Sequence, residues 1–339
     1  MKKNTPILLW LLSGCFLIFI MVVVGGITRL THSGLSMVEW HLFMGSIPPL
    51  NNADWIDTFA KYQQFPEFQE LNYDFNLEDF KSIFWWEYIH RMIGRLLGIV
   101  FIIPFLYFLI KRKLSNKLIK QSVVMFLMGG FQGFLGWFMV KSGLVSSPHV
   151  SHFRLAVHLI FAFLTFGYIF WVMLGIFFEE EITLADYPVI RKLGWILFPV
   201  VIVQIVYGAF VAGLRAGTLY NTFPKMGSEW IAEGVTAVSP FYENFIYGLA
   251  GVQFIHRYIA YAVVGLIIAI WWKSIRQPVQ YSQQLASRGL LYVVVLQFTL
   301  GVLTLLYSVP VLLGVLHQAG AFLLLAANLF LLHRYRRVK

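Results

Sequence analysis

Charged residues are scarce in this chain. Aspartate, glutamate, lysine and arginine make up 12% of its 339 residues, whereas apolar residues make up 59%. A soluble domain carries roughly 25% charged residues. The shortfall means that most of this chain cannot face water.

The few charges are also unbalanced, with a formal net charge of +10. In a membrane protein such an excess usually lies in cytoplasmic loops, where it sets the topology. No basic stretch is long enough, or interleaved with enough aromatic residues, to suggest nucleic-acid binding. The expected surroundings are membrane lipids, with no nucleic-acid partner.

Cysteine is almost absent. The single one, Cys15, lies inside the first apolar run. One cysteine can form neither an internal disulfide nor a thiolate metal cluster. We therefore expect Cys15 to be a small core or lipid-facing residue.

Long apolar runs dominate what is present. The chain is long enough for about eight spans of ~20 residues each, with loops between them. Apolar periodicity places the spans at residues 7–27, 88–110, 121–140, 155–178, 193–213, 255–273, 288–308 and 311–333. The sequence thus predicts an all-α integral membrane protein with eight transmembrane helices.

The first run also resembles a signal peptide in its position. A signal peptide has an apolar core of only ~7–15 residues, which is shorter than the run 7–27. This run also has a partner in the repeat described below, so we expect a retained helix. No presequence rich in arginine and serine precedes it, which favours a bacterial cytoplasmic membrane over an organellar one.

Basic residues fix the expected orientation. They gather before the first span, between spans two and three, between spans six and seven, and after the last span. The residues are Lys2, Lys3, Lys111, Arg112, Lys113, Lys117, Lys120, Lys273, Arg276, Arg288, Arg334, Arg336, Arg337 and Lys339. With eight spans all of these lie on one side, so both termini are expected in the cytoplasm. Two long loops, about 28–86 and 214–252, then lie on the outer side.

The two halves of the chain resemble each other. Gly25 and Gly34 recur as Gly208 and Gly217, and the segment 87–91 (EYIHR) recurs as 253–257 (QFIHR). Gln132 and Gly136 recur as Gln297 and Gly301, and His158 before Ala-Phe-Leu recurs as His317. Four matches in the same order indicate a duplication. We therefore expect two tandem four-helix bundles, residues 1–178 and 179–339, related by a pseudo-two-fold axis along the membrane normal.

Four of the nine histidines belong to this repeat. His90, His158, His256 and His317 each lie a few residues inside an expected span, all at similar depth near the outer face. Ionisable residues inside a membrane are costly and usually functional. Paired imidazoles on facing helices of a bundle hold a haem iron from both sides. A histidine of the core, copied by the duplication, would explain one per half but explains two less well.

The other five histidines carry less weight. His32, His41, His149 and His152 are expected in outer loops and His333 in the tail, where a solvated or interfacial role is favoured. Zinc or copper would need carboxylate or sulfur partners close to the repeated histidines. The second half offers neither.

One difference between the halves bears on chemistry. Glu87 precedes His90 by three residues and shares its helix face, whereas the equivalent residue in the second half is Gln253. A carboxylate can take up protons and an amide cannot at ordinary pH. This assigns chemistry to the first half and a structural or electron-transfer haem to the second. The alternative is that Glu87 only pairs with Arg91 or Arg95.

Several arginines are expected at outer helix ends. They are Arg91, Arg95, Arg154, Arg215 and Arg257. Guanidinium groups bind haem propionates through charge-assisted hydrogen bonds, but they also serve as interfacial anchors. The sequence leaves both roles open.

At full length the chain resembles the haem A synthase family. The resemblance rests on the segments 25–31 (GGITRLT), 33–37 (SGLSM), 87–91 and 221–224 (NTFP) with Met226, and on the four repeated histidines. The resemblance implies oxidation of the C8 methyl group of haem O to a formyl group, by two hydroxylations and loss of water. The product, haem A, serves terminal oxidases. Haem O synthase, the protohaem farnesyltransferase, is the partner that such an activity implies.

The resemblance also assigns roles to residues. His90 and His158 would flank the substrate haem, His256 and His317 would hold a haem b cofactor, and Glu87 would be the essential glutamate. Some bacterial members carry a cysteine pair in each long outer loop, and this chain does not. It therefore resembles the cysteine-free type.

Two other functions fit part of the pattern. A dihaem electron-transfer cytochrome of the membrane would explain the histidines but not Glu87 or the large outer loops. A haem or small-molecule transporter is suggested only by the repeat. The sequence leaves open the electron acceptor, the oxidant and the oligomeric state, a homo-oligomer included.

Overall fold

Eight long helices account for most of the computed structural model. The structure describes residues 4–38, 47–145, 148–178 and 185–337. Lys2, Lys3, His41 and Lys339, which the sequence interpretation uses, lie outside these ranges. The long helices are α1 (Thr5–Leu30), α4 (Leu77–Ile110), α5 (Asn116–Val145), α6 (His152–Phe177), α7 (Pro188–Gly213), α8 (Leu249–Ser274), α9 (Tyr281–Leu306) and α10 (Val311–Arg334).

All eight are long and apolar enough to cross a membrane, and the described residues contain no β-strand. The all-α prediction with eight spans is therefore confirmed. Most expected bounds fall within a few residues of the observed ones. The repeat axis and the division at residue 178 stay predictions.

Helix α4 differs from its expected span at its start. It begins at Leu77, eleven residues before the expected residue 88. Asn76 caps it, because its side chain accepts from the main-chain N–H of Asp79 while Asp79 accepts from that of Asn76. The apolar-span criterion missed this start because the first turns of α4 mix charged with aromatic residues.

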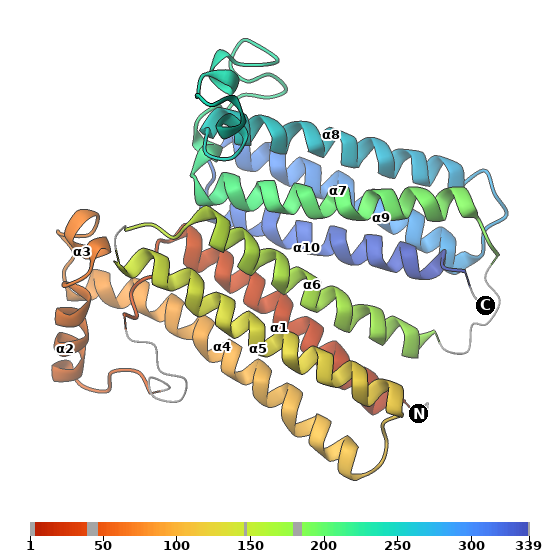
Figure 1. Cartoon of the computed structure of the whole chain (residues 1–339), viewed down its shortest axis with the longest axis horizontal. Coiled ribbons are helices and arrows are strands. Elements are labelled where there is room, and N and C mark those ends of the chain that lie inside the picture. The colour runs from red at the N-terminus through yellow and green to blue at the C-terminus, as the bar shows by residue number, and fades with distance from the viewer. Residues whose placement is uncertain (1–3, 39–46, 146–147, 179–184, 338–339) are drawn as a thin grey trace. The chain divides into compact units, whose positions relative to one another are not determined.

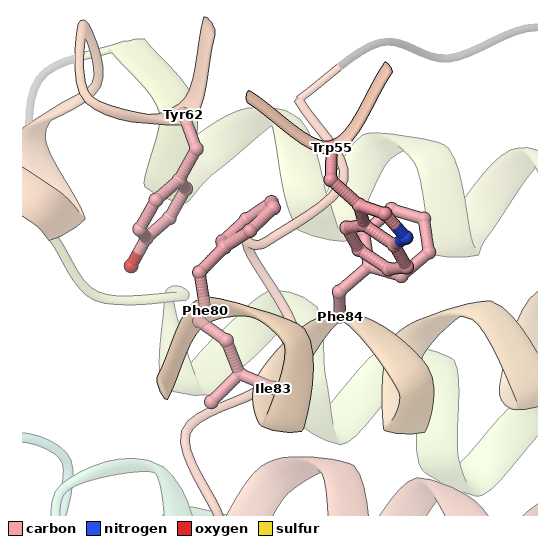
Figure 2. Packing of buried hydrophobic residues seen from close by; sticks show 5 residues of the cluster. All are labelled: Trp55, Tyr62, Phe80, Ile83 and Phe84. Atoms are coloured by element: carbon pink, nitrogen blue, oxygen red, sulfur yellow. The ribbon is translucent and has the colours of Figure 1, made fainter. Parts of the chain in front are cut away.

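Those first turns of α4 pack against two short helices, α2 (Asn52–Tyr62) and α3 (Pro66–Glu70). Figure 2 shows the buried hydrophobic cluster at this contact, in which Trp55 and Tyr62 of α2 meet Phe80, Ile83 and Phe84 of α4. The Tyr62 and Phe80 rings stack with centroids 5.1 Å apart. We refer to α2, α3 and residues 77–86 as the aromatic cap.

Contacts divide the chain into two units, Phe16–His158 and Met1–Cys15 with Leu159–Lys339. In the second unit, α7 contacts α8, α8 contacts α9, α9 contacts α10, and α10 contacts α7. Figure 1 shows these four helices side by side. They form a closed four-helix bundle in which α8 and α10 occupy opposite corners.

The loop between α7 and α8 folds onto the start of α8. It contains three 3-10 turns, η1 (Ala216–Thr218), η2 (Glu233–Thr236) and η3 (Phe241–Phe245). Its small core consists of Met226, Ala232 and Val235 with Ala250 of α8. The Asn244 side chain holds η3 to the main chain of Val238 through two hydrogen bonds of 2.7 Å.

Candidate functional site

Each of the four repeated histidines packs against a glycine on a neighbouring helix. A methyl group at that glycine would lie close to Cε1 of the imidazole. The pairs are Gly25 with His90 (3.1 Å), Gly136 with His158 (3.2 Å), Gly208 with His256 (3.1 Å) and Gly301 with His317 (2.7 Å). The glycines therefore leave the room that the imidazoles occupy. All four glycines belong to the sequence repeat, so the same packing occurs twice in each half.

The pair in the second half has the better-defined geometry. The rings of His256 on α8 and His317 on α10 have centroids 6.3 Å apart and planes inclined by 86°. Two imidazoles bound on opposite sides of one metal ion, with metal–nitrogen bonds of about 2.0–2.1 Å, have centroids about 6 Å apart. The spacing fits two axial ligands of a single iron.

Hydrogen bonding around this pair points the same way. The Nδ1 atoms of His256 and His317 are buried and have no hydrogen-bond partner. Buried polar atoms are normally satisfied, and an exception calls for a reason such as an absent ion. Gln204 of α7 places its Nε2 atom 3.5 Å from Nε2 of His256. The sequence interpretation missed Gln204, although an amide inside an apolar span is a visible signal.

The pair in the first half lies within the first unit. His90 lies on α4 and His158 on α6. The Nε2 atom of Gln132 lies 3.2 and 3.3 Å from the two ring nitrogens of His158 and donates to its main-chain oxygen. Nδ1 of His90 is buried without a partner. Gln132, on the neighbouring helix α5, thus orients the imidazole ring of His158.

Glu87 is buried, with an exposed fraction of 3%. One carboxylate oxygen accepts from Arg91 at 2.6 Å. The other accepts from the Ser36 hydroxyl and the Met37 main-chain N–H, both at 2.8 Å. Pairing with Arg91, raised as the alternative role of Glu87, is therefore present, and Glu87 also holds the segment that follows α1.

The arginine that follows each first histidine repeats one contact. Arg91 donates to the main-chain oxygen of Met37 at 2.8 Å, and Arg257 donates to that of Tyr220. Met37 follows Gly34 by three residues, as Tyr220 follows Gly217. Arg257 also donates to the carbonyls of Thr222 and Lys225. Each arginine therefore holds, through main-chain carbonyl groups, the loop that follows the preceding long helix of its half.

Gln253 takes the place of Glu87 in the second half. Its Nε2 atom donates to the main-chain oxygen of Tyr220 at 3.3 Å, and its Oε1 atom is buried without a partner. The amide supports the same loop as its counterpart but brings no charge. Glu87 and Gln253 thus hold equivalent loops in the two halves, and they differ in that only Glu87 is an acid.

The other arginines make separate contacts. Arg154 donates to the Phe138 carbonyl at 2.8 Å and lies 3.9 Å from the centroid of that ring. Arg95 contacts the sulfur of Met92. Arg215 follows α7 with a left-handed φ of 56°, and His32 after α1 matches it with 54°.

Two of the remaining histidines differ from expectation. His333 was expected in the tail, but it is fully buried near the end of α10, beside Trp171 and Phe178. Its side chain is buried because α10 continues to Arg334, so His333 is a helix residue and not part of a tail. His152 is the first residue of α6 rather than a loop residue, and it is 9% exposed. Within the described ranges, no three His, Cys, Asp or Glu side chains form a group that could hold a metal ion.

Comparison with known proteins covers nearly the whole chain. A family model described as "Cytochrome oxidase assembly protein" matches residues 8–329. A relative from Flavobacterium psychrophilum named "Heme A synthase" is 52% identical over 99% of this chain and 100% of its own. Relatives of the same name from Flavobacterium johnsoniae and Nitrosospira multiformis are 50% and 45% identical, each over 98% of this chain and over 98% and 94% of their own.

Proposed function

This chain belongs to the cytochrome oxidase assembly protein family, and we propose that it acts as a haem A synthase. It oxidises the C8 methyl group of haem O to a formyl group, by two successive hydroxylations and a dehydration. It thereby supplies haem A to terminal oxidases. Relatives named for this activity match the chain from end to end, which supports the proposal.

The observation that carries most weight is the spacing of His256 and His317. Their 6.3 Å centroid separation would let the two imidazoles hold the iron of a resident haem b between them. A bis-histidine haem iron supplies one-electron transfer when bound. Gly208 and Gly301 make room for the rings, and Gln204 steadies His256. This half therefore serves as the cofactor site.

The first half takes the substrate haem between His90 and His158. Its distinguishing residue is Glu87, whose side chain accepts hydrogen bonds from three donors one helical turn from His90. A carboxylate in this position can accept a proton as the substrate is oxidised, whereas Gln253 in the other half cannot. Arg91 and Ser36 keep the acceptor in place.

The location follows from the charge pattern. We place the protein in a bacterial cytoplasmic membrane, with both termini in the cytoplasm and the haem sites toward the outer face. Haem O synthase supplies the substrate and is the expected partner.

Product analysis tests the proposal. The chain is expressed in a host that makes haem O but not haem A, and the extracted haems are separated and identified by mass. We expect hydroxylated haem O and haem A to appear. A variant with His90 and His158 both replaced by alanine serves as the control and should yield neither. If the intact chain also yields neither, the proposed activity is wrong.

A dihaem electron carrier is the competing function, because two histidine pairs suit it equally well. It predicts bound haem that cycles between redox states with no change in its side groups. Recovery of haem O unchanged from a protein with both haem sites filled would favour that function.

A further inference from the structure

The two halves differ in the helix that carries the repeated glutamine. Gln132 and Gly136 of α5 align with Gln297 and Gly301 of α9. In that register, Gly129 corresponds to Val294 and Gly133 to Phe298. One half thus has glycine where the other has a branched or an aromatic side chain.

In the second half the larger side chain at 298 lies in the seam between α8 and α9, and the one at 294 is buried. Val294 is 3% exposed, and Phe298 lies with its ring centroid 5.8 Å from that of Tyr261 on α8. Phe223, from the loop above, lies 6.0 Å from the same Phe298 ring. The seam is therefore closed by packed side chains.

In the first half the equivalent seam between α4 and α5 is open. A methyl group added at Gly129 or Gly133 would meet no atom within 4 Å, and the same holds for Gly98 on α4. Helix α4 also packs much less against α5 than α8 packs against α9. The opening ends deeper along the helices, where Phe101 and Phe126 stack with centroids 6.3 Å apart.

This groove begins at the first histidine pair. Gly129, Gln132, Gly133 and Gly136 have the spacing of one helix face. Gly136 and Gln132 contact the His158 imidazole at the upper end of that face. At 1.5 Å per residue, Gly129 lies about 10 Å and Phe126 about 15 Å further along α5. Oε1 of Gln132 and Nδ1 of His90, both at the upper end, are buried without partners.

We propose that the groove between α4 and α5 holds the isoprenoid chain of the substrate haem. This inference rests on the proposed function, in which His90 and His158 flank haem O. Haem O differs from haem b in carrying a long farnesyl-derived side chain. The half assigned to haem O has the groove, and the half assigned to haem b has Val294 and Phe298 in its place.

The physical basis is close packing. An isoprenoid chain seated against the glycine face of α5 exchanges lipid for close contact with the helix backbone. Because lipid tails are as apolar as the isoprenoid chain, van der Waals contacts with the helices, rather than removal from water, favour binding. The groove therefore makes the first site selective for haems that carry the chain, and Gly133 a specificity-determining residue.

Titration of two haems tests the groove. Purified protein, with its resident haem in place, is titrated with haem O and with protohaem, which has the same iron and propionates but no isoprenoid chain. Binding is followed by absorbance. We expect the intact chain to bind haem O at least about tenfold more tightly than protohaem, because the isoprenoid chain adds many van der Waals contacts. We expect Gly133→Phe, which copies the second half, to abolish that preference by weakening haem O binding alone.

Leu127→Phe is the matched control, because it adds bulk to the same helix at a side chain that is 64% exposed. It should leave both affinities within about twofold, a change worth less than one buried methylene. The groove proposal is overturned if the intact chain binds both haems with equal affinity. It is also overturned if Gly133→Phe weakens the binding of both haems equally, or changes neither affinity. If the intact chain converts haem O yet shows no preference, only the groove fails. If it converts no haem O at all, the proposed function fails.

Discussion

The imidazole rings of His256 and His317 face each other across the bundle of α7 to α10 at a centroid distance of 6.3 Å. The two residues are 61 positions apart in the sequence and lie on helices at opposite corners of the bundle. That spacing matches two axial ligands on one iron, and it leads to the first prediction.

Replacing either residue should remove the resident haem signal. His256→Ala or His317→Ala leaves one axial ligand, so the low-spin bis-histidine spectrum should be lost from purified protein. The measurement is the absorption spectrum of the reduced form together with haem content per chain. His333→Ala serves as the control, since that histidine is also buried but lies at the far end of α10. An unchanged spectrum in both histidine variants would show that haem is held elsewhere.

Filling the space beside His317 should displace that ring. A methyl group at Gly301 would lie 2.7 Å from Cε1 of His317, closer than side-chain contacts allow. Gly301→Ala should therefore lower haem b occupancy, by about tenfold in affinity if ~1.4 kcal/mol of strain results. Gly265→Ala, where the added methyl group meets nothing within 4 Å, is the matched control and should keep full occupancy. Equal occupancy in the two variants would contradict this account.

Removing the charge of Glu87 should stop product formation while preserving the second haem. Glu87→Gln copies Gln253, so the loop support remains while the proton acceptor is lost. We expect less than about one per cent of the intact chain's haem A yield, as is typical when a general acid or base is removed. Product is quantified by mass after haem extraction.

The same experiment has an internal check. The absorption of the haem at His256 and His317 should not change in Glu87→Gln, because those residues are in the other half. Ser36→Ala removes one donor to the carboxylate and should lower the yield less. If the Glu87→Gln protein makes haem A at the normal rate, Glu87 serves only to hold the loop and accepts no proton in the reaction.

The aromatic cap should lose stability in alkali. Burial raises the pKa of Tyr62 above its usual value, and the nearby Glu67 carboxylate adds to the effect. A tyrosine whose pKa is higher in the folded state stabilises the fold below its unfolded pKa of about 10, and this stability is lost as the pH rises further. Unfolding of the cap, followed by tryptophan fluorescence, should become easier above about pH 10.

Tyr62→Phe should remove this pH dependence while keeping the stacked ring against Phe80. It also removes the hydrogen bonds that the Tyr62 hydroxyl makes with Glu67 and Asn72, so its stability at neutral pH should fall modestly. Tyr73→Phe is the control, because that ring is 71% exposed. An equal alkaline loss in the intact chain and in Tyr62→Phe would contradict the assignment.

Helix number and the repeat were readable from the sequence for a physical reason. A membrane span must satisfy its backbone hydrogen bonds within one helix, so ~20 apolar residues are both necessary and visible. The repeat then matched the histidines and glycines of one half with those of the other, although it did not show that each histidine packs against a glycine. The start of α4 was missed because Asn76 begins a helix outside the apolar run, which hydropathy does not register.

The sequence by itself determined that the chain is a membrane protein of eight helices, and it singled out His90, His158, His256, His317 and Glu87. Only the tertiary structure decided what these residues contact. It joined Glu87 to Ser36 and Met37, set His256 opposite His317, buried His333, and left the glycine face of α5 open. Apolar runs and repeats are local patterns along the chain, whereas side-chain contacts depend on which helix faces meet, and that is settled only by packing.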